Sequence, residues 1–507
     1  MRLGIDFGTT RTVVAAVDAG RHPVAAFEGE AAWADFVPGV ARIHGGGVLF
    51  GWDALSSEDG VLLRSIKRVV SELAPDDEVP GAGMSALDLV TGFLSHLRSL
   101  LVHASSLSPS ADETLEAMVS VPANASTRQR YITLEAFRRA GFRPLGLINE
   151  PTAAAVELAH RHLRGVGPGS PKRYAVIYDF GGGTFDAAAV SLVDSRFDLL
   201  TSEGVARLGG DDIDEEVLHM ALAEAEVDAA RLLPGERAAL LELCRAAKEA
   251  LRPSSRRLLV DLGEVLADAG EAVLDVPTLY ARCQPFVDRT VACVQSVLGA
   301  LERRGIDPNN PRELGAVYLV GGSVAFPPVA RTLRAVFKRK LKLAAQPHAA
   351  TAVGLAVAAD PQAHVFVRES TTRHFGVWRE GASGHEKTFD LLISKDTTRE
   401  GDEPVVIERC YRPAHPVGHL RYLECSALDE SGEPSGDMTP WAEIVFPYDP
   451  ELAGRADLED VAVERWQRTS NDEIAETYRY GADGRIAVEI HNRTRGYVRS
   501  YELGALR

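Results

Sequence analysis

Two short stretches of this 507-residue chain share an unusual combination of residues. GIDFGTT at residues 4–10 and VIYDFGGGTFD at residues 176–186 each end an apolar run with an aspartate and continue with glycine and threonine. Glycine lets a tight turn aim backbone N–H groups into one concavity, and threonine adds hydroxyls, which together suit a phosphate chain. The neighbouring Asp6 and Asp179 can hold a hydrated Mg²⁺, which keeps several waters and accepts few carboxylates. The repetition predicts two related half-domains that close on one nucleotide from opposite sides.

A third stretch, VYLVGGS at residues 317–323, predicts a strand that runs into a double-glycine turn before a helix. Gly321 and Gly322 let the backbone lie against a flat ligand such as adenine or ribose. Each stretch alone could be a tight hairpin or a plain strand–helix turn, but the three together favour a nucleotide site. The chain has no GxxxxGK[ST], which excludes a P-loop ATPase, and its DFG triplets lack the HRD loop and strand lysine of protein kinases.

Alternating strand and helix patterns over residues 1–360 would position these turns. The predicted strands are at 115–122, 145–148 and 317–320. The predicted helices are at 127–140, capped by Gly141, at 152–161, begun by Pro151, and at 212–251, with a break near Pro234. A further helix is predicted from an apolar face that carries Val329, Leu333, Val336 and Phe337. From about residue 361 short alternating strands replace the helical periodicity, at 405–408, 420–426, 442–446 and 485–490. We therefore predict an α/β nucleotide-binding domain followed by an antiparallel β-sandwich.

Composition excludes several kinds of protein. A hydrophobic content of 45% and a charged content of 25% are typical of globular proteins, and the length allows several domains. The net charge of −17 disfavours nucleic acid or an anionic membrane as the main partner. Five cysteines without a CxxC pair favour free, mostly buried thiols over disulfides or a zinc site. Asp6 interrupts any signal-peptide core, and no apolar run reaches the roughly 20 residues that span a bilayer, so we expect a cytoplasmic protein.

The first 360 or so residues resemble the heat-shock protein 70 (DnaK-type) chaperones of the actin-like ATPase superfamily. The most specific match is INEPTAAA at residues 148–155, which is nearly identical to the family's connecting motif. Residues 4–10 and 179–186 are similar to its two phosphate motifs, and residues 321–327 to its adenosine motif. Further matches are IKR at 66–68, VSVPA at 119–123 and LGGDD at 208–212. The resemblance implies an actin-like fold, with two related ribonuclease-H-like lobes around ATP or ADP.

The resemblance also implies a role for each matched position. Asp6 and Asp179 would hold Mg²⁺, largely through water. Lys67 would lie over the γ-phosphate and neutralise charge, while Glu150 and Asp186 would orient the attacking water or the metal's water shell, since phosphoryl transfer depends mainly on positioning and electrostatics. The alternatives are a surface lysine for Lys67 and a helix-start carboxylate for Glu150. The residues implied to bind the nucleotide are Gly8, Thr9, Thr10, Arg11, Gly181, Gly182, Gly183, Thr184 (also counted as catalytic), Gly209, Gly210, Asp211, Lys248, Gly321, Gly322 and Ser323.

The base slot departs from the family's pattern. The family carries a glutamate, a lysine and an arginine on one helix, where this chain has Arg245, Lys248 and Glu249. A further arginine of the adenosine motif is replaced by Ala325, and an acidic residue by His348. Because a planar guanidinium stacks on a base and Glu or Ala cannot, we expect weaker nucleotide binding and poor discrimination between ATP and GTP.

The remaining sequence resembles the family's β-sandwich substrate domain less closely. LLISKDTT at 391–398 is similar to its LIxKNTT strand, and YGADGRI at 480–486 to its DADGIL turn. VFV at 365–367 stands where the family has a leucine-rich linker, and no helical lid follows the sandwich in this sequence. We therefore expect an ATPase domain at 1–362 and a lidless β-sandwich at 363–507.

The sequence thus predicts a chaperone that binds and slowly hydrolyses ATP, coupled to the binding of unfolded or client protein segments and possibly of co-chaperones. The region around residues 391–410 would contact the client, and neither nucleic acid nor a membrane is an expected partner. Two alternatives stay open. One is a regulatory or scaffold protein that binds nucleotide with little turnover, because the linker and lid differ. The other is a small-molecule kinase such as a sugar kinase, against which EPT at 150–152 and the trailing sandwich speak.

Overall fold

The computed structural model of the chain divides into two compact units. Unit 1 comprises Met1–Leu73, Asp77–Ala123 and Thr133–Val367, and unit 2 comprises Ala74–Asp76, Asn124–Ile132 and Arg368–Arg507. The structure describes all residues except 30–31, 46, 58, 72, 164–169, 194–195, 206, 309, 311, 369–370, 372, 382–385, 396, 398–403, 456, 462–469, 482–484 and 504–507. The predicted turn at 482–484 and part of the predicted 391–398 strand therefore lie outside the described residues.

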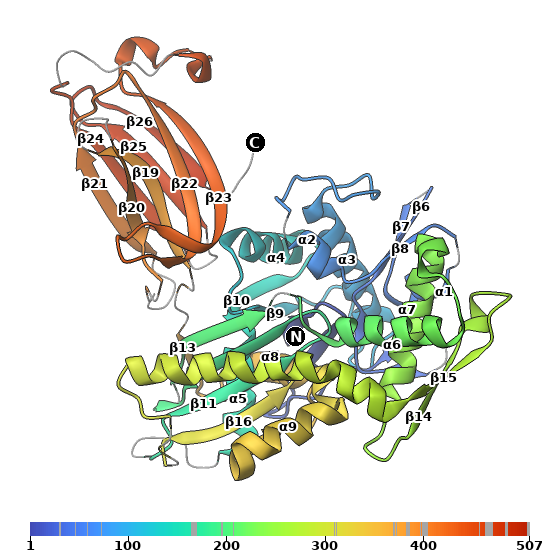
Figure 1. Cartoon of the computed structure of the whole chain (residues 1–507). Helices are drawn as coiled ribbons and strands as arrows, with labels where there is room; N and C mark the ends of the chain where they lie inside the picture. Colours follow the sequence, from blue (N-terminus) through green and yellow to red (C-terminus); the bar gives the residue numbers. More distant parts are fainter. Residues whose placement is uncertain are drawn as a thin grey trace. The chain divides into compact units, whose positions relative to one another are not determined.

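Unit 1 is built on two mixed sheets that repeat one plan (Figure 1). In each, a hairpin of two antiparallel strands is extended by a strand parallel to the first: β1 pairs with β2 and β9, and β11 pairs with β12 and β16. The first sheet has the order β10-β9-β1-β2-β5, with β1 Arg2–Phe7, β2 Arg11–Ala16, β5 Val37–Pro38, β9 Glu116–Val121 and β10 Arg143–Asn149. The second has the order β17-β16-β11-β12-β13-β18, with β11 Tyr174–Phe180, β12 Phe185–Ser191, β13 Arg196–Val205, β16 Leu314–Val320, β17 Leu341–Leu343 and β18 Phe366–Arg368. The prediction of two related lobes is confirmed.

Two helices of small residues join the lobes. α5 (Glu150–His162) packs on β11, β12 and β13, α10 (Ala350–Ala359) packs on β1, β2 and β9, and the two helices pack on each other. A side chain on Gly354 would collide with the backbone of Ala153, and one on Gly4 with the backbone of Ala356. The run of alanines and glycines therefore lets the backbones approach closely, which fixes one phosphate turn against the other.

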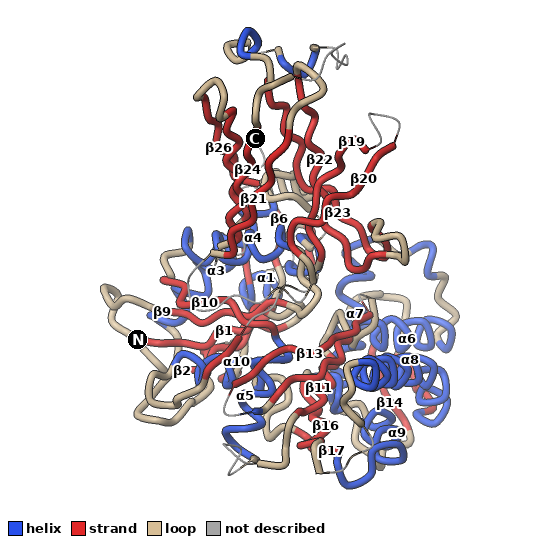
Figure 2. Tube along the Cα trace, turned by 90° about the vertical axis from the view of Figure 1, so that its left-hand side faces the viewer, coloured by secondary structure: helices blue, strands red, loops and turns tan. Residues whose placement is uncertain are grey.

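The outer face of the second sheet is covered by α8 (Val276–Arg303) and α9 (Pro327–Phe337), on the side away from α5 (Figure 2). Beyond them α6 (Gly210–Glu224) and α7 (Pro234–Glu249) pack with the hairpin of β14 (Arg257–Asp261) and β15 (Glu271–Asp275). The predicted break in the 212–251 helix exists, but Pro234 begins α7 instead of interrupting a helix. The apolar face predicted for α9 was wrong at Val336, whose side chain is exposed.

The other described elements of the α/β part are short or peripheral. They are β3 (Phe27–Glu28), β4 (Trp33–Ala34), β6 (Ala41–His44), β7 (Gly47–Phe50), α1 (Gly51–Ser56), β8 (Val61–Leu63), α2 (Ile66–Val70), α3 (Ala86–His103) and α4 (Thr127–Arg139), with short 3₁₀ turns. α4 ends one residue before the predicted limit, and Gly141 follows it with φ of +84°, as expected of a C-terminal cap.

The strands of unit 2 form two four-stranded antiparallel sheets that share one core. The first has the order β20-β19-β22-β23, with β19 His374–Gly381, β20 Glu386–Ile393, β22 Val417–Leu428 and β23 Pro434–Pro447. The second has the order β21-β24-β25-β26, with β21 Val405–Tyr411, β24 Ile474–Tyr480, β25 Ile486–Asn492 and β26 Tyr497–Leu503. Inside the sandwich, the fully buried Glu476 accepts hydrogen bonds from Arg379, Tyr411 and Tyr478. The predicted β-sandwich is confirmed.

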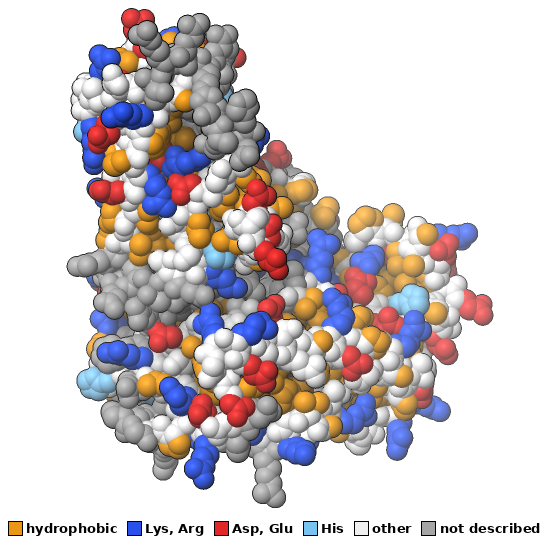
Figure 3. Space-filling model, turned by 60° about the vertical axis from the view of Figure 1, so that its left-hand side comes forward, with side chains coloured by type: hydrophobic (Ala, Val, Ile, Leu, Met, Phe, Trp, Pro, Cys, Tyr) orange, Lys and Arg blue, Asp and Glu red, His pale blue; other side chains and the backbone are white. Residues whose placement is uncertain are grey.

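Surface and membrane features can be stated for the described residues. Basic and acidic side chains alternate over the face drawn in Figure 3, with hydrophobic ones between them. Of the helices in the described part, none is both long enough and apolar enough to cross a membrane. The cysteines are free thiols, with Cys244, Cys283 and Cys425 buried and Cys410 exposed.

Candidate functional site

The two glycine–threonine turns meet face to face in unit 1. A side chain on Gly182 would collide with Thr10, and one on Gly183 would come within 2.7 Å of the Thr9 methyl group. The second turn is closed by a backbone hydrogen bond from Gly181 N–H to the Thr184 carbonyl at 3.1 Å. Only glycine permits this approach, so the structure brings together the two stretches that the sequence repeats.

The hydroxyl of Thr10 is an orphaned donor at this junction. Its Oγ1 is buried and has no hydrogen-bond partner among the described residues. A buried hydroxyl without a partner is costly, and a phosphate oxygen would satisfy it. The cradle therefore fits the phosphate chain predicted from the sequence.

A lysine and four carboxylates lie next to the turns. Lys67 is the second residue of the short helix α2, and its Nζ donates to Glu150 Oε1 at 2.6 Å. Glu150 is the first residue of α5, because Asn149 takes the extended backbone of an N-cap; the helix begins one residue before the predicted Pro151. Asp6 lies near the end of β1, and Asp179 near the end of β11 opposite Asp186 of β12.

The electrostatics of this group suit a site that binds a cation. Burial, and then Glu150, raises the pKa of Asp6 to about 6 and that of Asp186 to about 7. The same two causes, with Asp186 and Asp6 added, raise the pKa of Asp179 well above its usual range. Burial alone would lower the pKa of Lys67, but Glu150, Asp6 and Asp179 outweigh it and raise that pKa. Perturbed carboxylates grouped at one turn are characteristic of functional sites.

These carboxylates fit a hydrated Mg²⁺ better than a directly ligated metal. No three Asp, Glu, His or Cys side chains of the described part lie close enough together to ligate one ion directly. Asp6 also accepts a hydrogen bond from the Ser120 hydroxyl at 2.8 Å, so one of its oxygens already has a donor. Asp6 and Asp179 would then hold the ion through its water shell, which is the usual mode for Mg²⁺.

The segment after β13 and the turn after β16 complete the walls of the site. Backbone N–H groups of Gly210 and Asp211 donate to the carbonyls of Gly181 and Gly182 at 3.0 and 2.7 Å. Ser323 Oγ donates to the Gly181 carbonyl at 2.8 Å, and Gly321 has φ of +87°, which favours glycine. The structure therefore places Gly210, Asp211 and Ser323, all predicted to bind the nucleotide, against the second phosphate turn.

Lys248 of α7 bonds to two groups of the protein. Its Nζ lies 2.6 Å from Asp214 Oδ1 and donates to the Gly210 carbonyl at 2.9 Å, and Asp214 is fully buried. His348, which stands where the family has an acidic residue, pairs with Asp35 at 2.8 Å. The side chains of Lys248 and His348, at two positions of the predicted base slot, therefore both bond to other groups of the protein.

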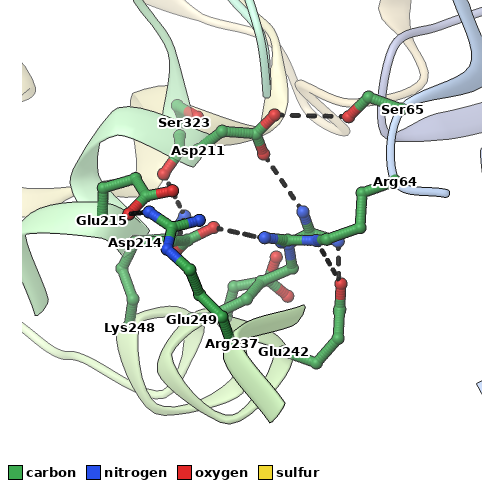
Figure 4. Close-up of polar contacts among 12 residues, drawn as sticks. Arg64, Ser65, Asp211, Asp214, Glu215, Arg237, Glu242, Lys248, Glu249 and Ser323 are labelled. Carbon is green, nitrogen blue, oxygen red and sulfur yellow. Dashed lines mark hydrogen bonds and ion pairs between the residues drawn. The ribbon is translucent and has the colours of Figure 1, made fainter. Parts of the chain in front are cut away.

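Sequence reasoning missed a charged network around Asp211 and Asp214 (Figure 4). Arg245 of α7 contacts both aspartates, at 3.0 and 3.5 Å, and Glu242 at 3.2 Å. Arg64, just before α2, reaches Glu242 at 2.7 Å. The network spans the two lobes, because Arg64 comes from the segment after β8 whereas Glu242 and Arg245 come from α7. The alternating charges on α7 indicate in the sequence that ion pairs could form there, but they do not identify which residues would pair.

The sequence also missed a contact between the first phosphate turn and α7. Arg11 Nη2 donates to Glu249 Oε1 and Oε2 at 2.7 and 2.6 Å. Arg11 was predicted to bind nucleotide and Glu249 was noted as a departure, but nothing in the sequence joined them. Ser120 was likewise missed as the partner of Asp6.

Comparison with known proteins agrees with this geometry. The family model described as Hsp70 protein matches residues 88–375, more than half of the 507 residues. A chaperone protein HscA homolog of Burkholderia pseudomallei is 32% identical over 382 residues, and one of Burkholderia multivorans is 30% identical over 381. Each match covers 71% of this chain and 58% of the relative, so the chain spans less than two thirds of the length of these curated relatives. With its two lobes of one plan and its trailing sandwich, this chain belongs to the Hsp70 family and has that family's actin-like ATPase fold.

Proposed function

We propose that this protein is an ATP-dependent chaperone of the Hsp70 type. Unit 1 binds ATP and hydrolyses it slowly, and this cycle is coupled to the binding of unfolded or client protein segments by the sandwich. In this proposal residues 1–362 are the ATPase domain and residues 363–507 the client-binding domain. The observation that carries it is the Lys67–Glu150 pair beside two apposed phosphate turns.

The phosphates would lie between the turns at residues 8–10 and 181–184, where the orphaned Thr10 hydroxyl would donate to a phosphate oxygen. A Mg²⁺ held through water by Asp6 and Asp179 would supply charge neutralisation for the phosphate oxygens. Lys67 adds a fixed positive charge at the same place, which stabilises charge that develops as the terminal phosphoryl group leaves.

Glu150 and Asp186 are the groups that would orient the attacking water. Asp186 has a pKa of about 7 and can hold a proton near neutral pH, and Glu150 is already bound to Lys67. Phosphoryl transfer asks little covalent chemistry of the protein, so a positioned water and neutralised charge are sufficient for slow hydrolysis.

The curated relatives bear the name chaperone protein HscA homolog, which supports the chaperone over the scaffold and kinase alternatives. Client segments, and possibly co-chaperones, are the partners that this reading implies. The region at 391–410 remains the predicted client contact; residues 396 and 398–403 of it lie outside the described residues.

Single-turnover hydrolysis of ATP with Mg²⁺, with and without an unfolded peptide, tests the proposal. We expect slow basal turnover that the peptide accelerates. Turnover at the buffer background in both conditions would favour a scaffold, and acceleration by a sugar but not by the peptide would favour a kinase. The matched control is the same peptide carrying acidic residues in place of its apolar ones.

A further inference from the structure

We propose that Arg11 is the residue that recognises the base of the nucleotide, by stacking its guanidinium on a purine ring. The proposal rests on the proposed nucleotide site and assigns the determinant of base preference within it. Glu249 acts as a positioning residue that holds the guanidinium in place.

Arg11 lies where the phosphate turn of one lobe faces α7 of the other. It is the first residue of β2, directly after Thr10, and its guanidinium reaches Glu249 on α7 with contacts of 2.7 and 2.6 Å. Its Nη1 lies 3.9 Å from where a side chain on Gly322 would begin. The guanidinium thus lies beside the phosphate turn and the third glycine turn at once, where a base attached to turn-bound phosphates would be placed.

Phe36 and Glu249 together hold the guanidinium in place. Its Cζ lies 4.3 Å from the centroid of the Phe36 ring, a cation–π distance, while Nη2 is held at its edge by Glu249. The side chain keeps 25% of its surface exposed. An arginine packed on one face and anchored at its edge has lost most of its rotamer freedom, so stacking on its other face costs little further entropy.

The charge balance favours a base over a phosphate as the partner of Arg11. Glu249 already neutralises the guanidinium, and a phosphate would have to compete with that carboxylate and approach its negative charge. A neutral, flat ring meets no such penalty, and Arg stacks on aromatic faces. The phosphates have their own donors in the turns and in Lys67.

Two cations of α7, Lys248 and Arg245, are engaged by groups of the protein. Lys248 bonds to Asp214 and the Gly210 carbonyl, and Arg245 pairs with Asp211, Asp214 and Glu242. Ala325, in the third glycine turn, offers only a methyl group. Arg11 therefore supplies, from the opposite lobe, the planar cation that α7 does not offer to a base.

Stacking on a guanidinium depends on ring area, so it should separate purines from pyrimidines and not adenine from guanine. Calorimetry of wild type, Arg11→Ala and Arg11→Lys with ATP, GTP and UTP, all with Mg²⁺, measures this. We expect wild type to bind both purine nucleotides at least about 5-fold tighter than UTP. Arg11→Ala should lose about 5- to 30-fold in ATP affinity and less than about 3-fold in UTP affinity.

The lysine variant and one double variant separate the effect of the planar guanidinium from the effect of its charge. Arg11→Lys keeps the charge and the pairing with Glu249 but not the plane, so it should lose the purine preference as Arg11→Ala does. Arg11→Ala combined with Glu249→Arg returns a guanidinium from α7 and should recover a purine preference. Thermal unfolding of each variant checks that it is folded, and the lysine variant serves if the alanine variant is not.

The outcomes are distinct. Equal losses for ATP and UTP would make Arg11 a phosphate or ribose contact and overturn the proposal, as would unchanged ATP affinity in Arg11→Ala or Arg11→Lys. Equal binding of ATP and UTP by wild type would also overturn it, while leaving the nucleotide site itself intact. Failure of wild type to bind any of the three nucleotides would instead refute the proposed function on which this inference rests.

Discussion

At the scale of the single residue, the sequence pattern leaves two interpretations of Lys67, and the contacts of its side chain bear on which one is right. The sequence allowed a surface lysine, but the side chain is only 15% exposed and pairs with Glu150, a residue 83 positions away. It also lies 5.8 Å from the centroid of the Phe7 ring. A lysine enclosed by carboxylates keeps its charge, which suits a group that must offset phosphate charge.

Lys67→Ala should slow ATP hydrolysis by at least about 10²-fold while nucleotide affinity stays nearly unchanged, because one transition-state electrostatic contact is lost. Single-turnover hydrolysis and calorimetry measure the two quantities. Lys342→Ala, on edge strand β17, is the control and should hydrolyse ATP at the wild-type rate. If Lys67→Ala hydrolyses ATP as fast as wild type, Lys67 has no catalytic role.

The raised pKa of Asp186 predicts that its ionisation lowers the free energy of unfolding of the nucleotide-free protein in a pH-dependent way. A carboxyl with a pKa of about 7 in the folded state and an ordinary value when unfolded binds more protons when folded. Stability therefore falls as pH rises from about 4 to about 7, with the full cost present above that range. Asp186→Asn should accordingly stabilise the nucleotide-free protein at pH 8, by roughly 1–3 kcal/mol, and by much less at pH 4.

Denaturant unfolding at both pH values measures this difference. The exposed Asp268→Asn, matched in chemistry, is the control and should not show the same pH-dependent gain. If Asp186→Asn destabilises the protein at pH 8, the folded protein stabilises the carboxylate, and burial and Glu150 do not raise its pKa.

At this scale, the sequence could predict features that depend on neighbouring residues, but not contacts between residues far apart in the chain. The glycines of the turns were predictable because a tight turn and a close approach restrict the residue type at that position. The pairing of Arg11 with Glu249 was not, because 238 positions separate them and either side chain alone could face solvent. The partner of His348 was missed for the same reason, since Asp35 lies 313 positions away.

At the scale of the element, the packing of α5 on α10 is the feature that sets the two lobes together. The backbones meet at Gly354 and Ala153, where a side chain on Gly354 would collide with the Ala153 carbonyl. Gly354→Ala should therefore destabilise the protein by about 1–3 kcal/mol or more and weaken nucleotide binding, because rigid helices cannot absorb the added methyl group. Thermal unfolding and calorimetry measure both effects.

Gly299 in α8 provides the matched control. A side chain there would meet only the end of Arg303, at 3.8 Å. Gly299→Ala should be neutral or stabilise the protein by up to about 1 kcal/mol, since alanine has the better helix propensity. Similar losses in the two variants would mean that close helix packing is not what Gly354 provides.

Elements with a regular pattern were predictable, and their exact limits were not. Strands such as β16 are buried throughout, and a short apolar run identifies them. The start of α5 was displaced by one residue because the extended backbone of Asn149, and not Pro151, decides where the helix begins. Val336 follows the helical period of Val329 and Leu333 yet is exposed, because α9 buries a narrower face than the pattern suggests.

At the scale of the whole molecule, one of the connections between the two units, the one that leads into the sandwich strands, is itself a strand. Residues 365–367, which stand in the place of the family's linker, run into β18 at the edge of the second sheet of unit 1. Val365 and Val367 are partly buried against the core that includes Ala155, Ala188 and Val190. The sequence identified this stretch as unlike the family's linker, but it gave no signal that the stretch would pair with β13.

A strand at a sheet edge can be paired or released, and coupling needs such an element with two arrangements that ligands prefer differently. Val367→Asp should weaken the packing of β18 and reduce the peptide stimulation of ATP hydrolysis at least about 5-fold, with basal turnover within about 2-fold of wild type. Leu343→Asp is the matched control, because β17 forms the other edge of the same sheet and Leu343 is already 54% exposed. Single-turnover hydrolysis with and without an unfolded peptide measures both variants. Full stimulation in Val367→Asp would place the coupling outside β18, and equal losses in both variants would mean that the sheet as a whole, not its connection to the sandwich, had been disturbed.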